Sequence, residues 1–182
     1  MQLRLEAIPE AFPIAGRFVI SRGAKTEAHV VRVTVADGSH VGHGECVPYG
    51  RYGETIESVL AEIQKHKLVV ESGAGRLAVN QQMPAGAARN AVDCALWDLE
   101  AKKAGASAYA AAGIILLKPV VTAYTLSLGT PEEMGAAANA ASARPVLKIK
   151  VGGAGDIERL AAVRDAYGGD KMWDHLNNVD GI

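Results

Sequence analysis

The heptapeptide 146–152, Val-Leu-Lys-Ile-Lys-Val-Gly, carries an alternating hydrophobic pattern. Apolar and polar residues alternate there with the period of a β-strand, so Lys148 and Lys150 leave one face and the apolar side chains leave the other. Each ammonium group disfavours protonation of its neighbour, and removal from water acts in the same direction. Two interpretations follow: an amphipathic strand with a wet lysine face, or a covered strand in which one lysine acts as a base near neutral pH.

Helix signals on both sides of this strand favour the covered alternative. The residues 130–133, Thr-Pro-Glu-Glu, form a capping box with proline at the first helical position, and Asp156 can cap a second helix. A strand between two helices belongs to a βαβ unit, whose parallel strands are usually covered on both faces. Residues 119–166 are therefore predicted as two βα units of an incomplete (β/α) barrel, with strands over 121–128 and 146–151 and helices over 131–143 and 156–166.

The region before residue 119 has a different order, with strands first and helices afterwards. Short apolar runs separated by prolines predict the early strands, and Asp37-Gly38 is a hairpin signal between two longer apolar runs. Residues 1–118 are therefore predicted to form a small α+β domain, an antiparallel meander plus helices. Its clearest predicted elements are strands over 28–35 and 41–45, a helix beginning at Ile56 and a helix over 85–103.

The last stretch, 167–182, shows no strand pattern where a third barrel strand is due, so we predict an atypical tail there. In that case the strand 146–151 lies at the open edge of a two-stranded parallel piece and carries unpaired backbone groups. Either the tail covers this edge or a second copy of the chain does. Because an open apolar edge is a template for pairing, we expect a homo-oligomer.

Composition and charge narrow the class of protein. The chain has 182 residues, enough for one domain or for one domain and part of another. Its 19 Lys and Arg residues against 20 Asp and Glu give a net charge of -1, and no basic run suggests nucleic acid or an anionic membrane as a partner. With no apolar run near the roughly 20 residues that span a bilayer, no signal-peptide pattern and two cysteines without a CxxC spacing, we expect a cytoplasmic protein.

The loop 48–53, Pro-Tyr-Gly-Arg-Tyr-Gly, follows the predicted meander and admits two interpretations. It is an ordinary polar connection, or it is a recognition loop. Tyrosines offer rigid contact area, and Arg51 can bind a carboxylate through two hydrogen bonds.

Four blocks of the sequence, taken in chain order, carry a resemblance to a known family: 18–23, 44–54, 84–99 and 147–150. They resemble the dipeptide epimerases of the enolase superfamily, in its muconate-lactonizing branch. The similarity covers about residues 1–166, and the Pro-Tyr-x-Arg-Tyr-Gly-Glu loop is similar to the L-Ala-D/L-Glu epimerases in particular. The resemblance implies a capping α+β domain over a TIM-type barrel whose strand ends hold Mg²⁺.

The same resemblance implies roles for individual side chains. In enolase-superfamily sites a lysine or histidine base works with one or two Mg²⁺ ions that stabilise an ene-diolate. By similarity, Lys150 takes or gives the proton α to a carboxylate, and Lys148 lowers the pKa of Lys150 and lies near the substrate carboxylate. The residues implied to close over a dipeptide substrate such as L-Ala-D/L-Glu are Arg22, Thr26, Tyr49, Arg51 and Tyr52.

The chain also departs from the family pattern. The family places metal-binding Asp, Glu and Asp residues on the third, fourth and fifth barrel strands and a second catalytic lysine on the sixth, none of which is predicted here. We do not take the acidic and histidine residues of the tail as metal ligands, because they sit in no predicted strand: Asp170, Asp174, His175 and Asp180. The sequence thus predicts one base and no metal site, whereas proton removal needs a cation on the developing charge and racemisation needs two bases.

We therefore interpret the sequence as the front part of a dipeptide epimerase, truncated by a frameshift near Gly168 or by the chosen boundaries, and inactive alone. One alternative is a non-catalytic fragment that associates with itself. Another is a different enolase-superfamily enzyme that shares the base, such as a muconate cycloisomerase or an o-succinylbenzoate synthase.

Overall fold

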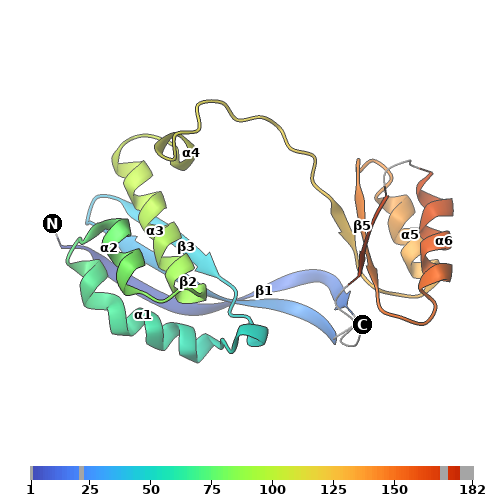
Figure 1. The fold of residues 1–182 in the computed structure, drawn as a ribbon, viewed down its shortest axis with the longest axis horizontal. Coiled ribbons are helices and arrows are strands. Elements are labelled where there is room, and N and C mark those ends of the chain that lie inside the picture. The colour runs from blue at the N-terminus through green and yellow to red at the C-terminus, as the bar shows by residue number, and fades with distance from the viewer. Residues whose placement is uncertain (1, 21–22, 169–171, 177–182) are drawn as a thin grey trace. The chain divides into compact units, whose positions relative to one another are not determined.

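The computed structural model describes residues 2–20, 23–168 and 172–176, and the chain divides into two compact units (Figure 1). The first unit comprises residues 1–12 and 27–117, and the second comprises 13–26 and 118–182. Residues 13–26 were predicted as part of the first domain. They cluster with the second unit because the amide of Leu128 donates to the carbonyl of Val19 at 3.0 Å, and the Ser127 hydroxyl donates to the carbonyl of Arg17 at 3.3 Å.

The sheet of the first unit confirms the predicted meander. Its strands are β1 (Arg4–Ile20), β2 (Gly23–Ala36) and β3 (Val41–Cys46), in the order β1-β2-β3. β2 and β3 pair antiparallel across the predicted turn, where the Asp37 carboxylate accepts hydrogen bonds from the amides of His40 and Ser39 at 2.8 and 2.9 Å. These bonds hold the pKa of Asp37 well below its usual range. β1 runs continuously through its prolines, which an edge strand tolerates.

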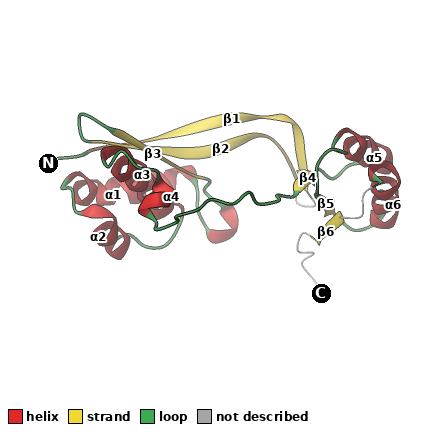
Figure 2. Ribbon diagram, turned by 90° about the horizontal axis from the view of Figure 1, so that it is seen from above, coloured by secondary structure: helices red, strands yellow, loops and turns green. Residues whose placement is uncertain are grey.

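Helices lie beside this sheet in a second layer (Figure 2). The two predicted helices are confirmed as α1 (Ile56–Glu71) and α3 (Ala87–Lys103), whereas α2 (Gly75–Gln82), α4 (Ala108–Ala111) and the 3₁₀ turn η1 (Gly50–Tyr52) were not predicted. No helix in the described part of the chain is long and apolar enough to cross a bilayer. The core between sheet and helices includes Val31, Val33, Val35, Ile63, Val92, Leu96 and Leu99.

α3 packs directly on the backbone of β3. Along this strand buried and exposed positions alternate, and the buried ones are Gly42, Gly44 and Cys46. A Cβ atom on Gly44 would lie 2.0 Å from the carbonyl oxygen of Ala91, and one on Gly42 would lie 2.1 Å from the carbonyl oxygen of Ala95. Only glycine permits so close an approach of helix and strand, so these two positions set the distance between the layers.

Side chains of α3 also cover the outer edge of β3. The Asp98 carboxylate accepts from the amide of His43 at 2.8 Å, and Lys102 Nζ donates to the carbonyl of Val41 at 2.8 Å and to Asp98 at 2.6 Å. Asp98 and Lys102 thus satisfy an amide and a carbonyl that an edge strand otherwise leaves unpaired.

We expect Gly44→Ala to destabilise the first unit strongly, because the new methyl group meets helix backbone that cannot rotate away. Overpacking of this kind costs about 1–3 kcal/mol and occasionally more, and we expect the upper end. Gly50→Ala is the matched control, since a Cβ atom there meets nothing within 4 Å. Urea unfolding measures both variants, and equal midpoints for the two would contradict the close contact.

The second unit holds a small parallel sheet of β4 (Tyr124–Leu126), β5 (Leu147–Val151) and β6 (Met172–Leu176), in the order β4-β5-β6. The helices α5 (Pro131–Ala140) and α6 (Asp156–Tyr167) lie on one face of it (Figures 1 and 2). This confirms the start of a barrel and the capping box of α5, in which the Thr130 hydroxyl accepts from the amide of Glu133. The apolar face of the sheet packs under these helices through Leu126, Met134, Ala138, Leu147, Ile149, Val151 and Val163.

β6 lies within residues 167–182, for which we predicted an atypical tail without a strand, and that prediction was wrong for residues 172–176. Residues 172–176 pair parallel with β5, from Leu147 beside Met172 to Val151 beside Leu176. The pattern Met-Trp-Asp-His-Leu has no clean alternation, so the strand depends on its neighbour rather than on local periodicity. β5 is therefore the middle strand, and the open edge that we expected there does not exist. An open edge at β5 therefore no longer supports a homo-oligomer, which stays a prediction.

Candidate functional site

The two lysines of the alternating motif leave the face of β5 that is opposite the apolar cluster. Lys150 is buried, with 8% of its surface exposed, and Lys148 is half-buried. In the register of the sheet Lys148 lies beside Thr125 of β4, and Lys150 lies beside His175 of β6. The structure thus favours the covered interpretation of this strand for Lys150.

The surroundings of Lys150 favour its neutral form. Burial lowers the pKa of Lys150 below the ordinary value, and the positive charge of Lys148 lowers it further. Both effects act against the ammonium form, because charge is costly away from water and repelled by a like charge. A lysine in such a place can accept a proton at a lower pH than an exposed lysine does.

The turn after β5 is built around one carboxylate. Asp156 was expected to cap α6, but the residue before the helix is Gly155, and Asp156 is the first helical residue. Its carboxylate accepts from the amides of Gly152 and Gly153 instead. The turn therefore closes directly behind the strand that carries the lysines.

In the first unit the loop 48–53 brings its three predicted recognition residues together. The ring centroids of Tyr49 and Tyr52 are 5.7 Å apart with an interplanar angle of 44°, and Arg51, which lies between the two tyrosines in sequence, belongs to η1. All three side chains are exposed, Tyr52 at 77%. The arrangement offers two aromatic surfaces and one guanidinium on a single turn.

Glu54 holds this loop in place, a role that we did not predict. One carboxylate oxygen accepts from the amide of Tyr49 at 3.2 Å, and the other accepts from the amide of Ala87 at 2.7 Å. Ala87 begins α3, whose preceding residue, Gly86, provides no side-chain cap. Two signals in the sequence could have shown this role of Glu54. The loop motif ends in a glutamate, and the following helix starts without a Ser, Thr, Asp or Asn cap.

The remaining predicted substrate residues are placed differently. Thr26 is an exposed residue of β2 and belongs to the second unit, as do the lysines. Arg22 lies outside the described residues. Tyr49, Arg51 and Tyr52 belong to the first unit. The structure thus shows two groups of predicted site residues, the lysine pair and the loop, each within its own unit.

Within the described ranges, no group of three His, Cys, Asp or Glu side chains is placed to hold a metal ion. Asp174 and His175, which we expected outside any strand, lie in β6, where Asp174 pairs with Ile149. Asp170 and Asp180 lie outside the described residues.

A cavity of about 770 Å³ in the second unit includes Thr125, the register neighbour of Lys148, in its lining but neither lysine. It is lined by β4 and the loop after it, by the inner face of α5 and by Arg17 and Val19 of β1. We therefore place the candidate site at the lysines.

Residues 4–113 match the N-terminal domain of the mandelate racemase/muconate lactonizing enzyme family. The chain belongs to this family. The match covers most of the first unit and residues 13–26 of the second, so the predicted resemblance to the muconate-lactonizing branch is confirmed.

Relatives of this family member include dipeptide epimerases. An L-Ala-D/L-Glu epimerase of Escherichia coli (strain K12) is 42% identical over 167 residues, which cover 89% of this chain and 51% of the relative. An enolase family member from Agrobacterium tumefaciens, with homology to dipeptide epimerases and with bound sodium and L-Ala-L-Glu, is 49% identical with a TM-score of 0.91, covering 99% of this chain and 56% of that one.

A dipeptide epimerase from Cytophaga hutchinsonii, complexed with Mg and D-Ala-L-Val, is 29% identical with a TM-score of 0.81. The similarity covers 97% of this chain and 51% of that one. The chain spans about half the length of the relatives that it matches.

The lowered pKa of Lys150 predicts a pH-dependent stability. Between the lowered folded pKa and the ordinary value of 10.5, the unfolded chain binds more protons than the folded chain, so the folded state gains stability as the pH rises. We expect the unfolding free energy of Lys150→Met minus that of the wild type to decrease from about pH 7 to about pH 10. Denaturant titrations at several pH values measure this difference.

The control for this measurement is Lys118→Met, at an exposed lysine of the second unit. A difference for Lys150→Met that stays constant or grows with pH, after subtraction of the control, would show that the surroundings of Lys150 do not disfavour its charge.

Proposed function

We propose that this chain supplies the capping domain and the first barrel strands of an isomerase that epimerises a dipeptide such as L-Ala-D/L-Glu. The observation that carries the proposal is the buried Lys150 beside Lys148 on a parallel strand, in a chain whose relatives are dipeptide epimerases. We expect the 182 residues alone to be inactive, because inversion at the α-carbon also requires a second base to which we assign no residue of this chain.

Lys150 acts as one base in this proposal. Its neutral amine takes the proton from the α-carbon, the C–H electron pair moves into the carboxylate as an enediolate, and Nζ becomes an ammonium. Acid–base catalysis is most efficient when the pKa of the catalytic group lies near the working pH, and the burial of Lys150 moves its pKa in that direction. The Lys148 ammonium places positive charge close to the carboxylate on which negative charge develops.

Magnesium belongs to the proposal only through the relatives. The Cytophaga hutchinsonii epimerase was crystallised with Mg and a dipeptide. An Mg²⁺ ion would stabilise the enediolate charge. The part of this chain that the structure describes offers no set of side chains that fits such an ion, so no step above passes through a metal.

The loop 48–53 selects the substrate in this proposal. Arg51 binds a carboxylate of the dipeptide, and Tyr49 and Tyr52 cover its side chain. Arg22 and Thr26 are assigned the same role by similarity alone.

We expect Lys150→Ala and Lys150→Arg to abolish exchange of the α-hydrogen of L-Ala-L-Glu, because arginine stays protonated near neutral pH. NMR in D₂O, with the protein that carries this chain, measures the exchange. Lys118→Arg, at an exposed lysine of the second unit, is the control and should exchange as the wild type does. Exchange at the wild-type rate in either Lys150 variant would remove Lys150 from its role.

We expect Arg51→Ala to weaken dipeptide binding roughly ten- to a hundred-fold, the usual effect of losing a charged hydrogen bond of about 1.5–3 kcal/mol. The melting temperature should stay unchanged, since Arg51 is exposed. Calorimetric titration with L-Ala-L-Glu gives the affinity, with Arg164→Ala on the exposed face of α6 as the control. A lower melting temperature with unchanged affinity would make Arg51 structural.

A further inference from the structure

A chain of hydrogen bonds begins immediately behind the strand that carries the lysines. The amide of Gly152 donates to both oxygens of Asp156 at 3.0 and 3.1 Å, and the amide of Gly153 donates to one of them at 2.7 Å. Gly153 has φ +117, a conformation in which glycine is favoured. One carboxylate thus fixes the direction in which the chain leaves β5, two residues after Lys150.

Arg159 connects this carboxylate to the neighbouring strand end. Its Nη1 atom donates to Asp156 Oδ1 at 2.8 Å and to the carbonyl of Ala154 at 2.9 Å. Its Nε atom donates to the carbonyl of Gly129, between β4 and α5, at 2.9 Å. Arg159 therefore joins the loop after β4 to the loop after β5.

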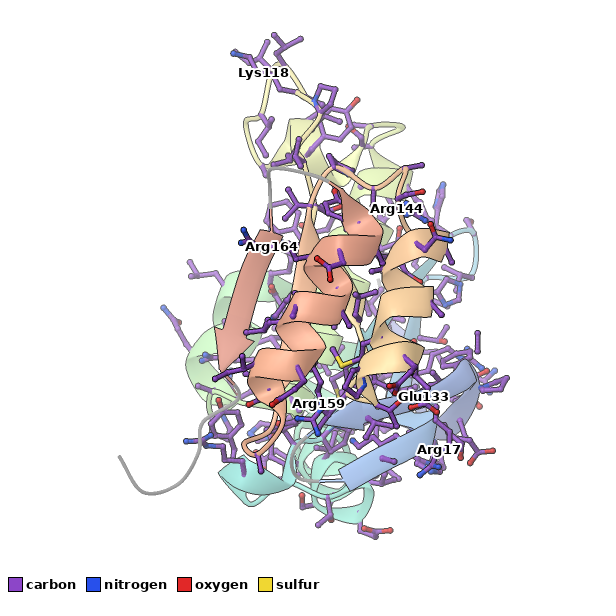
Figure 3. All side chains as sticks on the ribbon, turned by 90° about the vertical axis from the view of Figure 1, so that its right-hand side faces the viewer. Arg17, Lys118, Glu133, Arg144, Arg159 and Arg164 are labelled. Atoms are coloured by element: carbon purple, nitrogen blue, oxygen red, sulfur yellow. The ribbon has the colours of Figure 1, made fainter. Side chains whose placement is uncertain are left out.

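Both charged partners are largely removed from water, with side-chain exposures of 20% for Arg159 and 19% for Asp156. Partial burial raises the pKa of Asp156, but the bonds from the two glycine amides and from Arg159 outweigh it and lower that pKa. Charge-assisted bonds in such surroundings are shorter and stronger than neutral ones. Arg159 lies at the start of α6 beside the two loops, whereas Arg164 lies toward the other end of the helix (Figure 3).

We propose that Arg159 is a positioning residue for Lys150, acting through Asp156 to fix the end of β5 against the end of β4. The part that concerns catalysis rests on the proposed function. A flat guanidinium reaches three acceptors in different directions, and a lysine ammonium at the same place does not reproduce this set. Sites of (β/α) barrels are built at the carboxyl ends of the strands, so the position of this end decides where the base stands.

We call the set of hydrogen bonds by which Arg159 and Asp156 join the loop after β4 to the loop after β5 the tether. It is tested without any enzyme assay, by hydrogen–deuterium exchange of the amides of Gly152 and Gly153 in the 182-residue chain. In Arg159→Lys these amides should exchange at least about tenfold faster, because the charge remains but the connection to Gly129 is lost. Arg164→Lys is the matched control, on the same helix and exposed. Unchanged exchange in Arg159→Lys would overturn the proposal.

The catalytic part is tested by the kinetics of the protein that carries this chain. A base displaced by about 1 Å costs on the order of 10²-fold in rate, so Arg159→Lys should lower kcat to that extent while KM changes less than about twofold. Asp156→Asn, which keeps the shape and removes the charge, should act in the same direction and replaces Arg159→Lys if that variant does not fold.

Each of these experiments decides one part of the proposal about Arg159. Faster amide exchange with an unchanged kcat would make Arg159 a merely structural residue and overturn its positioning role. If the wild type fails to exchange the substrate α-hydrogen, the proposed function fails, and the positioning of a base fails with it. The tether between the two loops then stands or falls on the amide exchange alone.

Discussion

The first unit depends on how closely α3 approaches the backbone of β3. Because Gly42 and Gly44 have no side chains, the helix lies directly on the strand, and its buried stripe meets the valines of β2. At the start of the same helix the amide of Ala87 donates to Glu54, which also accepts from the amide of Tyr49, so the loop 48–53 is held against a helix that the two glycines allow onto the strand.

The second unit carries a different constraint, since its central strand has to bury a charge-bearing side chain. The apolar face of β5 stabilises the sheet through α5 and α6, while Lys150 on the opposite face costs stability as long as it is protonated. Groups whose function requires an unusual pKa are often buried even though their burial lowers the stability of the fold. The hydrogen bonds that Asp156 accepts from the amides of Gly152 and Gly153 and from Arg159 hold the end of this strand.

Local signals predicted much of this architecture, and non-local contacts account for what was missed. The Thr130 capping box and the alternation around Lys150 are each contained in a few consecutive residues. The structure confirms the helix and the strand that they predict. β6 was missed because Asp174 and His175 interrupt any period of two, so the strand exists through pairing with β5. Glu54 and Arg159 were missed as connecting residues because their partners lie up to 33 positions away.

The side chains on the edge of β3 have a consequence for the way this protein avoids unwanted association. Asp98 and Lys102 occupy the amide and carbonyl that an incoming strand from another molecule would need, and they do so from a helix already fixed by the core. Amyloid-like growth of the sheet on that side would first require α3 to leave. The edge of this sheet is thereby protected by side chains of its own unit.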